Sequence, residues 1–194
     1  MYPFLRLAKQ QFLVRNAPPL ATGETSVTRH ICWPWDLDMF AELNNGRVLT
    51  LYDLGRMPIA KRSGLLALLK RERWGFAVAG ATVRYRRRVK LFDRIEMRSR
   101  VIGWDPRFIY IEQGMWKRNG ECASHAVFRT AVTSGAGMIA PERVMGLLGL
   151  ETASPPLPLW VASWIEAEDH RPWPPMQEAV PAPLPLAATG EDAA

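Results

Sequence analysis

The chain has 194 residues, of which 48% are hydrophobic and 23% charged, and it contains two cysteines. This length predicts one domain, or two at most, with room for a substantial core, and the apolar content excludes a wholly disordered chain. Two cysteines cannot form a disulfide framework or a four-thiolate zinc site, so the sequence favours a cytoplasmic protein without a metal centre.

Charge is distributed unevenly along the chain. The formal net charge is +6, but residues 151–194 hold seven acidic side chains and one basic side chain. That segment therefore carries −6 and residues 1–150 carry +12. Such a basic segment favours anionic partners, whether nucleic acid, a membrane surface or a phosphate-bearing ligand, and does not choose among them.

The two ends of the chain are predicted to lie outside the folded domain, which we expect at residues 24–150. Residues 1–23 begin with an amphipathic basic segment that is either a short helix packed on the domain or an interfacial anchor that contacts a membrane. Residues 151–194 form a proline-rich acidic tail with one short helix predicted across 159–165. From Pro172 onward we expect an extended or disordered chain. No apolar run approaches the ~20 residues that span a bilayer, so no transmembrane helix is predicted.

The first half of the domain has strand and then helix signals. Residues 25–33 are β-rich, and a polar elbow leads to two asparagines and a glycine at 44–46. Asparagine is a strong N-cap, and apolar residues follow at helical spacing, so a helix is predicted from there to about Arg62. Pro58 is expected to kink or shorten this helix. A second short helix is predicted across residues 65–72.

The second half of the domain reads as strands. Four are predicted, at residues 76–90, 93–104, 107–117 and 121–134, with turn signals at Asp105-Pro106 and Asn119-Gly120. Strands of this length must curve, because the twist of each strand accumulates. The sequence therefore predicts an α+β fold in which a long curved antiparallel β-sheet wraps around a central α-helix.

Three segments around the predicted helix resemble the hotdog-fold acyl-CoA thioesterases. They read WPWDLD at 33–38, LNNGR at 43–47 and LYDLGR at 51–56, and similar segments follow at 63–65, 85–88 and 104–108. The pattern is similar to the 4-hydroxybenzoyl-CoA thioesterase-like branch, which includes thioesterase superfamily member 6. The resemblance spans about residues 25–145. It implies a five-stranded sheet around a central helix and an obligate homodimer with two active sites at its interface.

Thioester hydrolysis needs a group that delivers water or attacks the carbonyl, and a group that holds the oxyanion. A helix N-terminus supplies the second through free backbone N–H groups, here around Asn45 and Gly46. No Gly-x-Ser-x-Gly segment or Ser-His-Asp set is evident, so a carboxylate mechanism is favoured.

Three acids compete for the catalytic role. Asp38 lies six residues before Asn44 and matches the aspartate that acts in the resembled branch, but it can equally cap the elbow. Asp53 matches an acidic helix position that other hotdog thioesterases use across the dimer, but it can equally form an i,i+3 surface pair with Arg56. Glu42 stands where many relatives carry histidine, so it is either a base or a solvent-facing acid.

The candidate substrate-binding residues are polar and basic. Asn44 and Asn45 either cap the helix or position the water and the thioester. The basic run at 84–90 is read as a strand with alternate cations on one face, which is either a solvated sheet edge or a cradle for the phosphates of coenzyme A. We assign Arg86 and Arg88 to phosphate contact.

These patterns predict the hydrolysis of an acyl-CoA or acyl-carrier-protein thioester, with coenzyme A required only as part of the substrate. The predicted assembly is a homodimer, and the pairing of dimers into a tetramer stays open. No DNA- or RNA-recognition motif is found, so no nucleic-acid partner is predicted. The alternative is a catalytically silent hotdog module that binds an acyl chain or a protein partner, because Glu42 replaces the usual histidine.

Overall fold

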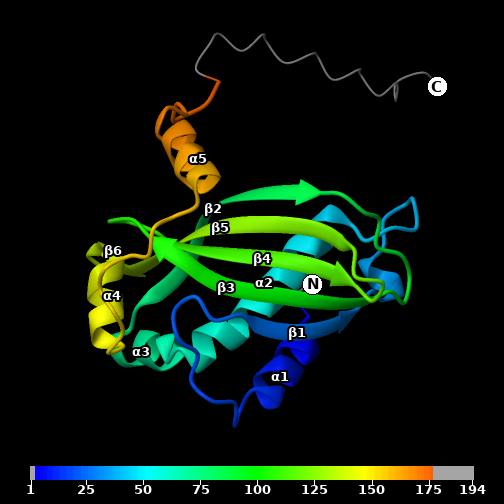
Figure 1. Ribbon diagram of the computed structural model, residues 1–194, viewed down its shortest axis with the longest axis horizontal. Helices are drawn as coiled ribbons and strands as arrows, with labels where there is room; N and C mark the ends of the chain where they lie inside the picture. Colours follow the sequence, from blue (N-terminus) through cyan, green and yellow to red (C-terminus); the bar gives the residue numbers. More distant parts are fainter. Residues whose placement is uncertain (1–2, 177–194) are drawn as a thin grey trace, which may run out of the picture. The chain divides into compact units, whose positions relative to one another are not determined.

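A computed structural model describes residues 3–176 of the chain (Figure 1). The chain divides into two compact units, of which the first ends at Leu157 and the second begins at Pro158. Of the elements in residues 3–176, the first unit contains the sheet and every helix except α5, Leu159–Asp169. The second contains helix α5, which confirms the helix predicted in the tail and extends it by four residues. Most of the extended segment expected after Pro172 lies outside the described residues.

The central element is helix α2, Asn45–Arg62, and its start follows from its cap. The Asn44 side-chain oxygen accepts hydrogen bonds from the backbone N–H groups of Gly46 at 2.9 Å and Arg47 at 3.3 Å. The predicted start and end of this helix are therefore confirmed. Of the two effects expected of Pro58, a kink or a shorter helix, the second is wrong, because α2 continues to Arg62. Pro58, Ile59 and Ala60 are buried, and their packing offsets one lost backbone hydrogen bond.

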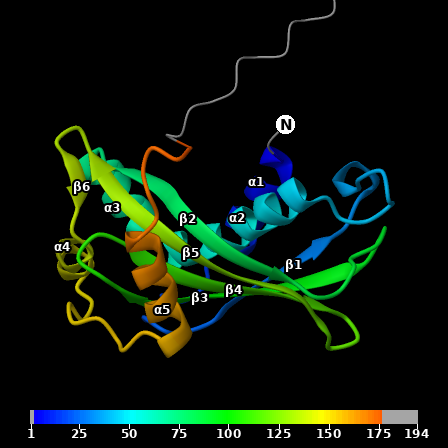
Figure 2. The same cartoon turned by 90° about the horizontal axis from the view of Figure 1, so that it is seen from above.

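The sheet is entirely antiparallel, in the order β1-β3-β4-β5-β2, with β6 paired to β5. Its strands are β1 Ser26–Ile31, β2 Gly75–Tyr85, β3 Arg94–Trp104, β4 Ile109–Lys117, β5 Cys122–Ser134 and β6 Gly137–Ile139. The sheet curls around α2 as a half-barrel, which Figure 2 shows from above. The predicted α+β architecture of a curved sheet around a central helix is thus confirmed.

One predicted strand is too long. The segment 76–90 was expected to be continuous, but β2 ends at Tyr85 and residues 86–90 form a loop. The ladder stops because the backbone N–H groups of Arg86 and Arg87 both donate to the Ala123 carbonyl, at 2.8 and 3.0 Å. The prediction that alternate cations share one face of a strand is therefore wrong beyond Tyr85. Arg86 and Arg88 belong to a loop and not to a sheet edge.

The core forms where α2 packs on the sheet. Leu51, Tyr52 and Leu54 of the helix are at most 1% exposed and belong to one cluster with Met97 and Phe128 of the strands. Close packing depends on a glycine, since a Cβ atom at Gly55 would lie 2.6 Å from the Met97 Cγ. The helix therefore lies nearer to β3 and β4 than any larger residue at this position would allow.

Four shorter helical elements complete the first unit. They are α1 Phe4–Leu13, the 3₁₀ turn η1 Pro34–Asp36, α3 Leu65–Glu72 and α4 Pro141–Leu147. Helix α3 has the predicted bounds. Helix α1 packs against α2 near β1, at the sheet edge opposite β2 (Figures 1 and 2). Within residues 3–176, no helix has the length and apolar character needed to cross a bilayer.

Candidate functional site

The candidate site is a cavity of about 220 Å³ at the N-terminal end of α2. Glu42, Asn45 and the loop 86–89 line its polar side. Its apolar side includes Val48 of α2 and Met115 of β4. The cavity thus combines a carboxylate, a helix start and an apolar wall, which is the set of features that thioester chemistry requires.

The first turn of α2 supplies backbone N–H groups beside the cavity, which Asn45 lines. The Asn44 side chain satisfies the N–H groups of Gly46 and Arg47, so these two are occupied by the cap. Within residues 3–176, no hydrogen-bond partner is found for the backbone N–H of Asn45. Because the partial positive charge of a helix is concentrated in its first turn, this N–H is suited to bind an oxyanion.

Glu42 is the carboxylate on the cavity wall. Its side chain is 26% exposed, and Oε1 lies 2.9 Å from a guanidinium nitrogen of Arg88. Arg88 is itself 76% exposed, so water screens this ion pair and the pair holds the carboxylate only weakly. The backbone of Glu42 is held in place by a single β-bridge to Lys90.

Asp38 does not line the cavity. Its Oδ1 accepts the backbone N–H groups of Phe40 at 2.8 Å and Glu42 at 3.2 Å, so the side chain closes its own turn. The backbone of Asp38 also donates to the Glu42 carbonyl at 2.8 Å. Asp38 therefore holds the backbone of Glu42, which lines the cavity. The second carboxylate oxygen of Asp38 makes no hydrogen bond within this turn.

Asp53 lies on α2 away from this cavity. Its Oδ1 accepts a hydrogen bond from Arg56 at 2.8 Å, which is the i,i+3 pair that the sequence allowed. The pair is not a surface pair, because Arg56 is 6% exposed. Arg56 also donates to Gln113 at 3.0 Å, and its Cζ lies 4.2 Å from the centre of the Phe128 ring. Asp53 is 39% exposed and is thus an accessible carboxylate held by a buried cation.

Two buried polar contacts near the site were not anticipated. The Tyr52 hydroxyl lies 2.8 Å from Ser124, which lines the cavity, and burial raises the pKa of Tyr52 above its ordinary value. Asp36 has no exposed surface and pairs with Arg6 at 2.6 Å and Arg47 at 3.0 Å. Arg6, Asp36 and Arg47 are separated in the chain, and no spacing rule in the sequence predicts that they pair.

The structure therefore brings together five of the eight candidate residues. Glu42, Asn45, Arg86 and Arg88 share the cavity, and Asn44 caps the helix beside it. The other three are not available at the cavity in the same way. The Gly46 N–H is bonded to the Asn44 cap, the Asp38 carboxylate is bonded within its own turn, and Asp53 lies further along α2. Among residues 3–176, no three His, Cys, Asp or Glu side chains lie close enough together to hold a metal ion.

Comparisons with known proteins identify the family of the chain. A family model for the thioesterase-like superfamily matches residues 32–165, and the chain belongs to that family. The protein THEM6 of Xenopus laevis is 30% identical over 72% of this chain and 66% of its own length. THEM6 of Danio rerio is 33% identical over 58% of this chain and 54% of its own length. The chain therefore spans about half to two thirds of the length of these relatives.

Solved structures share the fold. The probable thioesterase YbaW of Escherichia coli superposes with a TM-score of 0.59 at 18% identity, over 63% of this chain and 95% of its own. A DHNA-CoA thioesterase from Staphylococcus aureus superposes with a TM-score of 0.57 at 12% identity, over 75% of this chain and 91% of its own. At such low identities the similarity shows the hotdog fold alone, and that fold is the one the sequence predicted.

Proposed function

We propose that this chain is a thioesterase that hydrolyses an acyl-CoA or acyl-carrier-protein thioester to the free acid and the thiol. The observation that carries the proposal is the cavity at the start of α2, where the Glu42 carboxylate and the backbone N–H of Asn45 meet an apolar wall. Membership of the thioesterase-like superfamily supports the same reaction class.

In the proposed reaction the thioester carbonyl oxygen points at the N-terminus of α2. The Asn45 N–H donates to this oxygen as negative charge develops there, and the helix dipole favours that charge. The Glu42 carboxylate removes a proton from a water molecule, whose oxygen attacks the carbonyl carbon. When the tetrahedral intermediate collapses, the C–S bond breaks and the proton passes from Glu42 to the leaving thiolate.

The choice of Glu42 rests on its position at the cavity. Asp38 matches the family's aspartate, but it contributes two backbone hydrogen bonds to the turn that carries Glu42. We therefore assign Asp38 a positioning role, in which it holds the backbone of residue 42 at the cavity. This assignment differs from the resemblance, which implies a catalytic role for Asp38 and a histidine at the position of Glu42.

A homodimer would complete the site. Pockets that enclose whole ligands usually measure about 300–1,000 Å³, and the cavity at α2 is smaller than that. Strand β2 is an edge strand whose Ala77, Val78, Ala79 and Ala81 are exposed, which is the type of edge that proteins normally cover. Pairing of two β2 edges would bury these residues and is compatible with a role for the partner's Asp53.

The arginines of the 86–90 loop are proposed to bind the phosphates of the carrier. Arg86 and Arg88 are exposed at the mouth of the cavity, and guanidinium groups bind phosphate oxygens in a bidentate manner. A carrier protein would present the phosphate of its pantetheine arm to the same loop.

The test is hydrolysis of short, long and aromatic acyl-CoAs by the full chain, followed through the released thiol. We expect Glu42→Gln to lower kcat by about 10²–10⁴-fold, which is the usual contribution of a general base. The matched control is Glu121→Gln, since Glu121 also pairs with an arginine of the loop, at 3.0 Å, but does not line the cavity. Light scattering on the same samples should give twice the mass of one chain.

Two outcomes would contradict the proposal in different ways. If Asp38→Asn abolishes hydrolysis while Glu42→Gln leaves kcat unchanged, the catalytic carboxylate is Asp38 and our mechanism is wrong. If every acyl-CoA binds without being hydrolysed, the chain is instead a silent acyl-binding module, which is the function that the replacement of histidine by Glu42 favours.

A further inference from the structure

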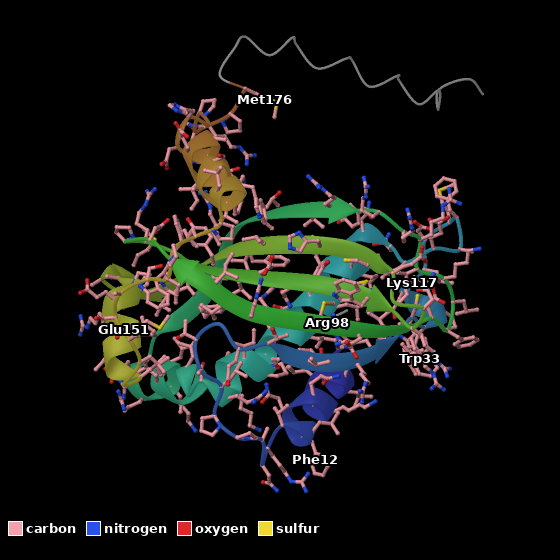
Figure 3. All side chains as sticks on the ribbon, in the orientation of Figure 1. Phe12, Trp33, Arg98, Lys117, Glu151 and Met176 are labelled. Carbon is pink, nitrogen blue, oxygen red and sulfur yellow. The ribbon has the colours of Figure 1, made fainter. Side chains whose placement is uncertain are left out.

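Helix α1 packs Leu7 on the core but presents most of its large apolar side chains to solvent. Leu5 is 89% exposed, Phe12 and Leu13 are each 61% exposed, and Phe12 lies at the outer end of the helix (Figure 3). The residue of α1 that is most deeply buried is polar: Gln10 is 3% exposed and donates a hydrogen bond to the Arg29 carbonyl. An ordinary surface helix has the opposite orientation, with its apolar face against the core.

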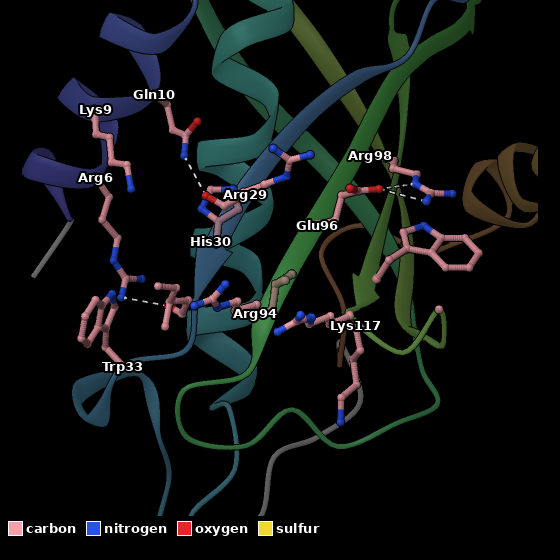
Figure 4. Close-up of a pocket in the computed structure, with 15 residues that line it drawn as sticks. Arg6, Lys9, Gln10, Arg29, His30, Trp33, Arg94, Glu96, Arg98 and Lys117 are labelled. Atoms are coloured by element: carbon pink, nitrogen blue, oxygen red, sulfur yellow. Dashed lines mark hydrogen bonds and ion pairs between the residues drawn. The ribbon is translucent and has the colours of Figure 1, made fainter.

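A basic groove of about 860 Å³ lies beside this helix. Figure 4 shows Arg6 and Lys9 on α1, Arg29 on β1, and Arg94 and Lys117 further along the groove. The cationic residues that line it are Arg6, Lys9, Arg29, Arg94, Arg98, Lys117 and Arg118, and the acidic residue that lines it is Glu96.

Much of this positive charge is not neutralised by the protein. Arg6 pairs with Asp36, Arg98 with Glu96 and Lys117 with Asp93. Across residues 3–176, no ion pair is found for the other four cations, which are Lys9, Arg29, Arg94 and Arg118. His30 also lines the groove, and its burial, together with the charges of Arg6 and Lys9, lowers its pKa to about 4.

The apolar face and the groove are continuous along α1. Leu5, Lys9 and Leu13 are spaced four residues apart, so they form one column on the helix. Lys9 belongs both to this column and to the groove. An apolar helix face that is bordered by cations is typical of segments that lie in the interface of a bilayer.

We propose that α1 and the adjacent basic groove form a docking surface for a membrane that contains anionic lipids. The apolar side chains of α1 enter the headgroup region, and the cations of the groove lie over the lipid phosphates. The two attractions act together, and stable peripheral binding requires two such signals. The surface lies at the β1 edge, opposite the β2 edge of the proposed dimer, so it does not depend on the proposed function.

A membrane fits these observations better than other anionic partners. A nucleic acid would engage the groove but would leave Leu5, Phe12 and Leu13 in water. The folded domain of a second copy would meet the groove with charge of the same sign, because residues 1–150 carry +12. An anionic bilayer satisfies the apolar and the cationic features at once.

The experiment is co-sedimentation of the full chain with lipid vesicles. We compare vesicles of phosphatidylcholine alone with vesicles of phosphatidylcholine and phosphatidylglycerol in equal amounts. Binding is expected only to the second kind and should weaken as salt is raised. We expect Lys9→Glu to weaken it by roughly fivefold or more, since each basic residue near an anionic surface contributes about that factor.

Two matched variants separate the surface from general effects. Leu5→Ser combined with Phe12→Ser is expected to reduce vesicle binding by more than about tenfold. Its control combines Met138→Ser and Leu147→Ser, which alter exposed apolar residues of β6 and α4. Lys70→Glu on α3 is the control for Lys9→Glu. Both controls should bind vesicles as the native chain does, and circular dichroism should confirm that all variants are folded.

Several results would overturn the proposal. These are equal binding to both kinds of vesicle, binding to neither, or an equal loss with the control variants. Stronger binding to a single-stranded oligonucleotide than to vesicles would assign the groove to nucleic acid. A change of oligomeric mass in the Leu5→Ser and Phe12→Ser variant, without loss of vesicle binding, would assign the helix face to a second copy of the chain.

Discussion

Arg56 is the most informative single position for testing the packing of α2 on the sheet. It is 6% exposed, donates to Gln113 at 3.0 Å and to Asp53 at 2.8 Å, and lies 4.2 Å from the Phe128 ring centre. Arg56→Met keeps most of the side-chain volume and removes the charge. The buried Gln113 oxygen then loses a donor, which costs about 1–3 kcal/mol.

The remaining losses can be added in the same way. The cation–π contact with Phe128 contributes about 1–2 kcal/mol when it is shielded from water. The ion pair with Asp53 contributes less than about 1 kcal/mol, because that carboxylate is 39% exposed. We therefore expect Arg56→Met to lower the free energy of unfolding by roughly 3 kcal/mol, within the range seen when a buried ion pair is broken.

Urea denaturation at one fixed protein concentration measures this loss, since a dimer's stability depends on concentration. The control is Arg62→Met on the same helix, where the guanidinium donates one exposed hydrogen bond to the Pro18 carbonyl. That variant should lose less than about 1 kcal/mol. A loss below about 1 kcal/mol for Arg56→Met would refute the reasoning, because the guanidinium would then be no part of the core.

Two further predictions concern stability. The pKa of His30 is lowered to about 4 in the folded chain, so the unfolded chain binds more protons between that pH and the ordinary pKa of 6.5. The free energy of unfolding is therefore expected to fall as the pH drops through this window, by about 2 kcal/mol near pH 5. Urea titrations of His30→Gln should show a smaller fall. An equal fall in both proteins would contradict the assignment. Gly55→Ala places a Cβ atom 2.6 Å from Met97 Cγ and is expected to cost about 1–3 kcal/mol in thermal or urea unfolding. Gly135→Ala, whose Cβ would meet nothing within 4 Å, should be near neutral, and equal costs at the two glycines would show that overpacking is not the cause.

Elements with strong local signals were predicted well from the sequence. Helix α2 begins beside the asparagine that caps it, and α3 has the predicted bounds. The breaks at Asp105-Pro106 and Asn119-Gly120 fall between β3, β4 and β5. Each signal is a side-chain cap or a turn preference that acts within a few residues. The local sequence is therefore enough to predict these boundaries.

The errors arose where distant parts of the chain decide the structure. The basic run after Tyr85 has strand-like alternation, but two of its N–H groups turn to one carbonyl of β5. For Asp53 the sequence left open an i,i+3 surface pair with Arg56, whereas the structure packs Arg56 against Gln113 and Phe128 in the core. Asp38 and Glu42 were both candidates from the resemblance, and only the fold shows which of them lines the cavity.

The sequence by itself determined the order of the elements, the wrapped α+β architecture, the capped start of α2 and the family, because these follow from local patterns and from segments read in order. Tertiary structure alone decided which side chains meet. It placed Glu42, Asn45 and Ser124 around one cavity, and it turned the apolar face of α1 outward beside a basic groove. The physical reason is that burial and pairing depend on contacts between residues far apart in the chain, and no periodicity along the sequence records those contacts.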